Sequence, residues 1–504
     1  MFTYKDKDTG PKARLVILGN KLKNKPSCSD TFASTPHPAS VRTLFALAAQ
    51  SGHDIHQLDI SQAFCQSDDL KSHLRTYIRP PPAYESDPNI VWRLIKPLYG
   101  LSIAPKAWQC TLRSYLTSTG WKSVGFEDTF YTRSTGTTTM HLIYHVDDIL
   151  LSFDEHDSHE AQTFKTDLLK RFAGLDLGPV KRYLGVDIFR NSDGSIHLSQ
   201  ERLINDLLDR HLPPNSNPVK TPIDHNTAQD LDQAPTEPTA NKDIYQKYNE
   251  IVGSLRYICE WTRGDLSFSA HVLARSLSNP GLAHLEAAIR TLRYLKGTSS
   301  LTLKFSPQQD PSLQNTLVGF ADADYAAHKQ TRKSITAWTF FLNGGAISWR
   351  CKLQPSVAVS TSEAEFVSAS KAALEAVWLR RILADLGIPQ PQPTPMYEDN
   401  HACILMSENP VHRERTKHID IRIHSLREKV QLGEVRLVPC PTAHMTADAL
   451  TKALPAPAFI KHRQTILGHT PFSAPPFPSD LTVPAHSVTY YLPIPVLESE
   501  CLSL

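Results

Sequence analysis

The run His141-Leu-Ile-Tyr-His-Val-Asp-Asp-Ile-Leu-Leu-Ser-Phe153 places two adjacent aspartates, Asp147 and Asp148, between apolar residues that favour β-structure. This pattern predicts a strand, a tight turn bearing both acids, and a second strand. Paired carboxylates are costly in apolar surroundings unless a positive charge lies on them. Because oxygen ligands bind divalent cations well, the run predicts a metal platform. An ordinary hairpin turn made of aspartates is the other interpretation.

A third acid upstream favours the metal platform. Asp59 lies in His56-Gln-Leu-Asp-Ile-Ser-Gln-Ala-Phe64, at the end of a short apolar strand followed by a helix-compatible stretch. Three acids on two strand ends can hold two metal ions, which stabilise the attacking and leaving oxygens of an in-line phosphoryl displacement. The residues therefore predict the palm of a polymerase.

A second acidic unit lies between Leu313 and Leu454. It begins with an apolar strand that ends on acids, Thr316 to Asp324, and continues with a hairpin around Asn343-Gly-Gly345, where Asn-Gly supplies the positive φ angles of a tight turn. A long helix from about Ser362 to Leu386 stops at Gly387, as a helix C-terminus should. The strand Met396 to Asp399 and a later helix through Asp448 follow. This order of elements is that of an RNase H fold.

The ordered series of motifs resembles one family, the copia-type LTR retrotransposon Pol polyproteins, in their reverse transcriptase and RNase H portion. The resemblance runs from about Lys12 to about Leu454. Its motifs include Lys12 to Val16, Gln57 to Phe64, Leu98 to Trp108, the Val-Asp-Asp box, Tyr183 to Ile188, Val252 to Tyr257, Leu292 to Thr298, Asp322 to Tyr325, Ser360 to Phe366, Thr416 to Ile421 and Thr446 to Lys452. Two departures stand out: His145 replaces the usual Tyr, and Leu101-Ser-Ile-Ala-Pro105 replaces Leu-Lys-Gln-Ala-Pro.

The resemblance implies an α/β (α+β) chain: polymerase fingers and palm with a two-strand catalytic Asp-Asp hairpin, a helical connection, and an RNase H-like α/β domain. It implies RNA-directed DNA polymerase and ribonuclease H activities, with two Mg²⁺ ions per site and Mn²⁺ as an alternative. The implied partners are an RNA template, a DNA primer, dNTPs, an RNA–DNA hybrid and the other portions of the polyprotein. Carried over residue by residue, the metal ligands are Asp59, Asp147 and Asp148 in the polymerase and Asp322, Glu365, Asp399 and Asp448 in the nuclease.

Structural roles compete with the catalytic ones for three of these acids. Ser362 and Glu365 fit a helix capping box. Asp448 in a first helical turn suits the helix dipole, and Asp399 beside Asn400 suits a turn. The order of four acids at strand ends and helix starts favours catalysis over these roles.

Basic residues complete the predicted contacts. The resemblance implies that Lys12 and Arg14 contact the incoming triphosphate in the fingers. No acid lies between Ala326 and Lys352, so the basic residues on or beside the hairpin are candidate phosphate contacts that position a duplex without reading its sequence. They are Lys329, Arg332, Lys333, Arg350 and Lys352.

Proline and periodicity divide the chain of 504 residues. We expect fingers and palm over residues 1–212, a proline-rich linker and helical thumb or connection over 213–312, the RNase H-like domain over 313–454, and a proline-rich, poorly ordered tail over 455–504.

Composition indicates an intracellular protein. The eight cysteines are isolated in sequence, which is typical of reduced thiols. The N-terminus lacks an apolar signal core, and no run approaches the ~20 apolar residues of a membrane span. We therefore expect no membrane association and a cytoplasmic or nuclear location, including a virus-like particle, rather than secretion. The net charge of +2 is uninformative, because nucleic acid responds to local charge.

Two other classes of protein compete with an active enzyme. A catalytically decayed or domesticated remnant that binds nucleic acid is one, and the substitutions in the polymerase boxes favour it; the presence of all seven candidate carboxylates argues against it. A stand-alone nuclease is the other, and it leaves the Val-Asp-Asp run unexplained. Primer extension on an RNA template, measured beside hybrid cleavage, discriminates among the three.

Overall fold

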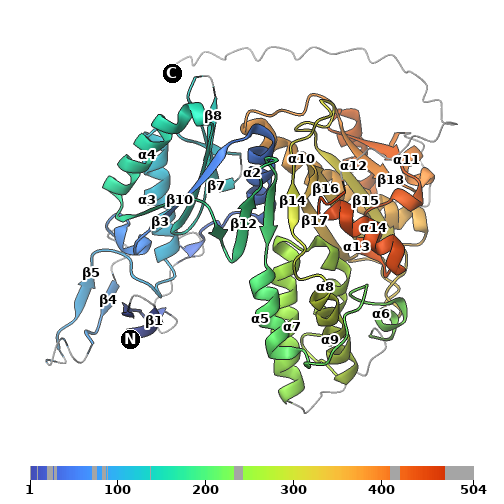
Figure 1. The fold of residues 1–504 in the computed structure, drawn as a ribbon, viewed down its shortest axis with the longest axis horizontal. Coiled ribbons are helices and arrows are strands. Elements are labelled where there is room, and N and C mark those ends of the chain that lie inside the picture. Colours follow the sequence, from blue (N-terminus) through green and yellow to red (C-terminus); the bar gives the residue numbers. More distant parts are fainter. Residues whose placement is uncertain are drawn as a thin grey trace, which may run out of the picture.

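The computed structural model describes residues 2–7, 10–19, 27, 31–70, 76–81, 84, 87, 89–125, 127–136, 138–231, 242–408 and 420–470, with the backbone alone for 2–14 and 420–423. Within this range it is a mixed α/β structure, in which a sheet-containing part built from the first 180 residues lies beside a larger part that holds a second sheet and a group of helices (Figure 1). No helix in the described residues has the length and apolarity that crossing a bilayer requires.

The first large sheet has six strands in the order β10-β3-β9-β8-β7-β6. Its apolar residues alternate between two faces, and both faces are covered. Leu58, Ile149 and Leu151 pack under α3 and α4, whereas Ile55 and Leu150 pack with α2. The elements are α2 (Pro38–Ser51), β3 (Asp54–Ile60), α3 (Ala104–Ser118), β6 (Lys122–Val124), β7 (Glu127–Ser134), β8 (Thr139–His145), β9 (Asp148–Phe153), α4 (Ser158–Arg171) and β10 (Gly174–Pro179).

Two small two-stranded sheets precede and follow α2 in the chain: β1 (Phe2–Lys7) with β2 (Gly10–Leu15), and β4 (Thr76–Ile78) with β5 (Trp92–Leu94). Lys12 and Arg14 lie on β2, but their side chains fall outside the described residues. Their predicted contact with a triphosphate therefore stays a prediction.

A four-stranded sheet and a group of helices form the connection. The sheet order is β11-β12-β13-β14, so β14 pairs with β13 although about a hundred residues separate them in the chain. The expected helical periodicity of residues 245–296 is present as α7, α8 and α9. The elements are β11 (Arg182–Tyr183), β12 (Val186–Arg190), β13 (Ile196–Ser199), α5 (Glu201–His211), α6 (His225–Leu231), α7 (Lys242–Trp261), α8 (Ser267–Ala274), α9 (Leu282–Lys296) and β14 (Leu303–Phe305).

The second large sheet has the order β17-β16-β15-β18-β19. The three strands β15, β16 and β17 are antiparallel, and β18 and β19 run parallel to β15. This is the RNase H-like strand order that the sequence predicts. The elements are β15 (Val318–Asp324), β16 (Ile335–Leu342), β17 (Gly345–Leu353), α10 (Thr361–Asp385), β18 (Thr394–Glu398), α11 (His401–Glu408), α12 (Asp420–Gln431), β19 (Val435–Pro439) and α13 (Asp448–Thr451).

Local chemistry sets the predicted hairpin and helix end in this domain. Asn343 and Gly344 have φ angles of 47° and 88°, the left-handed values that a two-residue hairpin loop between β16 and β17 requires. Gly387, with φ of 84°, follows the last turn of α10. Both predicted signals are confirmed.

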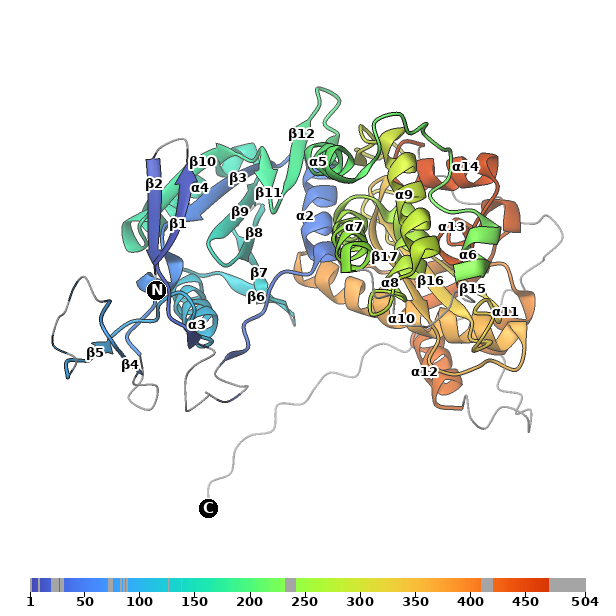
Figure 2. The same cartoon turned by 90° about the horizontal axis from the view of Figure 1, so that it is seen from below.

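Helix α2 joins the two large sheets. Figure 2 shows it between the six-stranded sheet and the RNase H-like part, and it contacts β17 directly. The side chain of Arg42 is buried: Nε donates to the carbonyl of Ile347 in β17 at 2.6 Å, and Nη1 donates to the carbonyl of Glu260 in α7 at 2.5 Å. One hydrophobic core runs through α2, the connection and the RNase H-like sheet. The six-stranded sheet and the RNase H-like sheet are therefore packed together through α2 rather than separately.

The C-terminal segment differs from the expected poorly ordered tail. Residues Ala456–Ile466 form the helix α14, which buries Phe459 and Ile466. Phe459 packs edge-on against Tyr294 of α9, with ring centroids 5.7 Å apart. Proline at the start of a helix is compatible with this structure, because its missing N–H would have no partner there. Residues 471–504, the rest of the predicted tail, lie outside the described residues.

Candidate active sites

The three acids predicted for the polymerase site lie at one edge of the six-stranded sheet. Asp59 near the end of β3 is the direct antiparallel partner of Asp148 at the start of β9. Asp147 lies in the turn between β8 and β9, and its carbonyl accepts a hydrogen bond from the amide of Ile60 at 2.9 Å. The predicted strand, turn and strand are present, and the turn is anchored to the strand that carries the third acid.

The turn holds an unfavourable backbone conformation. Val146 has a φ of 58°, a left-handed value that is rare for a β-branched residue. The indole Nε1 of Trp108, on the buried face of α3, donates to the carbonyl of Val146 at 2.6 Å. This hydrogen bond stabilises the turn that carries Asp147. Trp108 is a supporting residue that the sequence analysis quoted within a motif without giving it a role.

The environment of Asp148 disfavours its charge. Burial raises the pKa of its carboxyl group, and the neighbouring Asp147 raises it further, while the amide Nε2 of Gln57, which donates to Oδ1 at 3.3 Å, opposes the shift. The carboxylate oxygens of Asp59, Asp147 and Asp148 do not all come within 4.8 Å of one another, in contrast to two other acidic groups of the described chain. The backbone register is thus in place, and the side-chain oxygens remain apart.

A pocket of about 470 Å³ opens beside Asp148. It is lined by Gln57 and Asp148 from the strands and by Lys181, Arg182 and Gly185 around β11. Two cationic side chains beside a carboxylate site suit a phosphate backbone. Sequence reasoning did not select Lys181 and Arg182, because their approach to Asp148 depends on how β10 and β11 fold back on the sheet.

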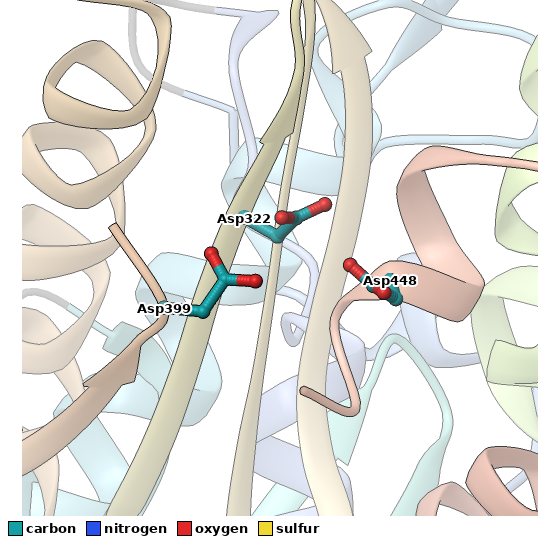
Figure 3. A group of neighbouring side chains, drawn as sticks. All are labelled: Asp322, Asp399 and Asp448. Atoms are coloured by element: carbon teal, nitrogen blue, oxygen red, sulfur yellow. The ribbon is translucent and has the colours of Figure 1, made fainter. Parts of the chain in front are cut away.

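Three acids of the RNase H-like domain converge. Asp322 comes from β15, Asp399 directly follows β18, and Asp448 is the first residue of α13. One carboxylate oxygen of each lies within 4.8 Å of the other two, and Figure 3 shows the three carboxylates facing a common space. Parallel strands that end at the same edge of a sheet bring Asp322 and Asp399 together, and α13 supplies the third.

Hydrogen bonds hold these carboxylates in place. Thr451 Oγ1 donates to Asp322 Oδ2, and Thr442 Oγ1 donates to Asp399 Oδ2 at 3.0 Å. Lys452 Nζ forms an ion pair with Asp448 Oδ1 at 2.7 Å. In the described part of the chain, Lys452 is the one basic side chain that forms an ion pair with these three acids.

Glu365 belongs to an adjacent group. It lies in the first turns of α10, and one of its oxygens is within 4.8 Å of oxygens of Glu398 and Asp399, which are likewise within that distance of each other. Asp399 is thus shared by the two groups. Sequence analysis missed Glu398. The available signal was its position two residues after the apolar Met396 on a strand, which places both side chains on one buried face.

The capping role considered for Glu365 is wrong. The helix α10 begins one residue before Ser362, with Ser360 as its N-cap: the Ser360 hydroxyl accepts from the amide of Glu363 at 3.2 Å, and Glu363 Oε2 accepts from the amide of Val359 at 2.7 Å. Ser360 and Glu363, two residues before the predicted pair, therefore supply the side-chain hydrogen bonds at the start of this helix, and Glu363 reaches the residue before the N-cap rather than the N-cap amide of a standard capping box. At the start of the next helix, α11, Asn400 Oδ1 accepts a hydrogen bond from the amide of Cys403.

Burial and like charges raise the pKa of several of these acids. Burial, followed by Glu398 and Asp322, raises the pKa of Glu365 to about 11. Burial, followed by the Asp322 charge, raises the pKa of Asp448 to about 7 although Lys452 opposes this. The pKa of Glu398 is also well above its usual range, chiefly through burial. Strongly shifted acids in one cluster are typical of functional sites.

The predicted basic contacts fall into two places. Lys329, Arg332 and Lys333 lie in the connection from β15 to β16, and Arg332 is exposed. Arg350 and Lys352 lie on β17 and line a separate pocket of about 300 Å³ with Arg256 and His271 of the connection. Since β16 separates β17 from the strand that carries Asp322, these two are not neighbours of the acidic group in the sheet. All five remain predicted contacts.

The fold combines a sheet that bears opposed aspartates with a second, RNase H-like sheet that bears its own acidic group, and comparisons with known proteins show the family that has this combination. Residues 1–225 match the family model described as "Reverse transcriptase (RNA-dependent DNA polymerase)". The chain is 35% identical over 453 residues to the Retrovirus-related Pol polyprotein from transposon TNT 1-94 of Nicotiana tabacum, a match that covers 89% of this chain and 33% of the relative. It is 33% identical to the corresponding polyprotein from transposon RE1 of Arabidopsis thaliana, with 89% and 30% covered.

A shorter relative is covered almost completely. The Putative transposon Ty5-1 protein YCL074W of Saccharomyces cerevisiae is 30% identical over 305 residues, which are 59% of this chain and 94% of the relative. The chain belongs to the family of copia-type retrotransposon Pol polyproteins. It spans about a third of the length of the TNT 1-94 and RE1 polyproteins.

Proposed function

We propose that the chain is an RNA-directed DNA polymerase with ribonuclease H activity, which copies RNA into DNA and cleaves the RNA of the resulting hybrid. The observation that carries the proposal is the presence of two separate acidic regions on one chain. One is built on the opposed strands β3 and β9, and the other at the ends of β15 and β18. Each is made of oxygen donors, as divalent-cation chemistry on phosphates requires.

The nuclease region fits a divalent cation such as Mg²⁺ or Mn²⁺. Its donors are all carboxylate oxygens, and the Oε2 atoms of Glu365 and Glu398 are buried without a hydrogen-bond partner. Asp322, Asp399, Asp448 and Glu365 would hold the ions. When bound, such ions activate a water and neutralise charge that develops on the scissile phosphate. The chain itself contributes fixed carboxylate positions through Thr451, Thr442 and Lys452.

The polymerase region would hold its ions through Asp59, Asp147 and Asp148. Trp108 and the Ile60 amide keep the turn that bears Asp147 beside the β3 strand. Lys181 and Arg182, in the pocket next to Asp148, are suited to hold the phosphate backbone of a primer or template. The partners of this function are an RNA template, a DNA primer, dNTPs and the hybrid product, together with the other portions of the polyprotein.

A nucleic-acid-binding remnant without polymerase activity is the second candidate. It is favoured by one observation: the oxygens of the three polymerase acids do not gather within 4.8 Å as the nuclease acids do. This candidate predicts template binding without synthesis.

The test measures both activities on the full chain with Mg²⁺. We expect extension of a DNA primer on an RNA template and cleavage of RNA in an RNA–DNA hybrid, both lost in EDTA. Cleavage without extension would favour the second candidate, in which the polymerase region binds nucleic acid but no longer catalyses synthesis. Absence of both, in a folded protein that binds the hybrid, would refute the enzymatic proposal.

A further inference from the structure

Glu398 is an acid without a role in the function proposed so far. It is the last residue of β18 and is 0% exposed. Its Oε1 accepts a hydrogen bond from the amide of Asn400 at 3.0 Å, and its Oε2 is buried with no hydrogen-bond partner. An unpaired buried carboxylate oxygen is costly, so its presence calls for a ligand.

The neighbouring Glu365 has the same feature. It is 7% exposed, and its Oε2 also lacks a hydrogen-bond partner. Among the ion pairs formed by the described residues, none includes Glu365 or Glu398; the ammonium group of Lys452 pairs with Asp448 instead. Two buried glutamates therefore face each other without a protein cation between them.

Asp399 links these glutamates to the rest of the site. Its oxygens lie within 4.8 Å of those of Glu365 and Glu398, and also within that distance of those of Asp322 and Asp448. A carboxylate shared between two groups of oxygen ligands is the arrangement that two neighbouring cations need. All the donors are oxygens, which favours hard divalent cations over the metals that bind sulfur or imidazole.

We infer that Glu398 is a further cation ligand, which with Glu365 and Asp399 forms an all-oxygen site for Mg²⁺ or Mn²⁺ next to the group of Asp322, Asp399 and Asp448. This inference rests on the proposed nuclease function and adds a fifth carboxylate to it. The alternative is a purely structural acid that stays protonated in the core.

The test uses Mn²⁺ as the probe and the full chain carrying Asp148→Asn, so that the polymerase region contributes less to binding. Glu398→Gln keeps the shape and the acceptor for the Asn400 amide but removes the charge. Calorimetric titration should show one Mn²⁺-binding step weakened by about tenfold or more. The rise in melting temperature on adding Mn²⁺ should also shrink, because a bound ligand stabilises the folded state by an amount that grows with the logarithm of its affinity.

Glu375→Gln is the matched control. Glu375 lies on the same helix α10, and its Oε1 accepts from the Ser348 hydroxyl at 2.5 Å, outside both acidic groups. It should leave the Mn²⁺ titration unchanged. Unchanged titration by Glu398→Gln would overturn the inference. A Glu398→Gln chain that is unfolded or less stable in EDTA would also overturn it, since a cation site is destabilised by its own unpaired charge when no cation is present.

Asp322→Asn, made in the same Asp148→Asn chain, separates this inference from the proposed function. If Asp322→Asn weakens Mn²⁺ binding and abolishes hybrid cleavage while Glu398→Gln changes neither, the function stands and the inference fails. If Asp322→Asn leaves both intact, the nuclease proposal itself fails.

Discussion

Asp59 and Asp148 are directly opposed across the antiparallel pairing of β3 and β9. The register places acids that are 89 positions apart in the chain on neighbouring strands. At the same edge of the sheet, the amide of Ile60 donates a hydrogen bond to the carbonyl of Asp147. Like charges on neighbouring strands repel one another, and cations between them offset this repulsion. The pairing is therefore the structural basis for expecting metal-dependent synthesis here.

Asp147→Asn and Asp148→Asn should each reduce Mg²⁺-dependent primer extension by on the order of a hundredfold or more, because each removes a charge aimed at the cations. Hybrid cleavage by the same proteins serves as the internal control and should persist. Ordinary synthesis by either variant would show that the two aspartates are only a turn.

Trp108→Phe should lower primer extension by about tenfold without touching a metal ligand. The change removes the indole donor to the Val146 carbonyl and leaves the turn, which already has an unfavourable φ, with a weaker anchor. The loss should appear in the rate of extension at saturating Mg²⁺ rather than in the Mg²⁺ concentration needed. Wild-type rates from this variant would mean that packing alone holds the turn.

Asp322→Asn or Asp399→Asn should abolish cleavage of RNA in a hybrid while primer extension remains within about twofold of wild type. The charge removed lies on the second sheet, and charges separated by more than a screening length of about 8 Å interact weakly. Parallel measurement of both activities on one preparation checks this. A matching fall in synthesis would indicate that the two regions work as a single site.

Arg42→Met should behave differently, with both activities falling together with thermal stability. The Arg42 guanidinium carbon lies 3.9 Å from the centroid of the Trp349 ring. The guanidinium nitrogens donate hydrogen bonds to carbonyls of β17 and α7. Its loss leaves buried carbonyls unpaired, at a cost of about 1 to 3 kcal/mol each. Urea unfolding measures the loss, and a variant as stable as wild type would show that α2 does not couple the two parts.

Glu365→Gln should make the metal-free protein less sensitive to pH. The pKa of Glu365 is raised from 4.5 to about 11 on folding, so the folded chain holds this proton more tightly than the unfolded chain. The resulting stability is complete below about pH 4.5 and is lost progressively as pH rises toward 11.

In EDTA, the free energy of unfolding of the wild type should therefore fall between pH 6 and pH 9, and that of Glu365→Gln should fall less over the same interval. Urea unfolding at the two pH values gives the comparison. If the free energy of unfolding changed equally with pH in the two proteins, the proton taken up on folding would not be bound by Glu365. Hybrid cleavage should nonetheless be lost in the variant. Because Ser360 and Glu363 supply the side-chain hydrogen bonds at the start of α10, that loss would not reflect a change at the helix start.

Features that depend on near neighbours in the chain can be predicted from the sequence of this protein. The Asp-Asp turn is predicted by the β-forming apolar residues on both sides of it, the Asn343-Gly344 loop by its tolerance of positive φ, and the end of α10 by Gly387. The order of strands and helices then predicts the RNase H-like sheet. These signals are local because they arise from backbone conformation and side-chain alternation.

In contrast, which acids lie close together and how the two large sheets pack depend on the tertiary structure. Glu398 and Asp399 are adjacent in sequence, yet their burial against Glu365 depends on α10 crossing β15 and on β18 lying beside it. Three other contacts also join segments that are far apart in the chain. Arg42 donates a hydrogen bond to β17, and α14 packs against α9. Lys181 and Arg182 line the same pocket as Asp148. Desolvation and like-charge repulsion act through space, so residue spacing alone does not determine them.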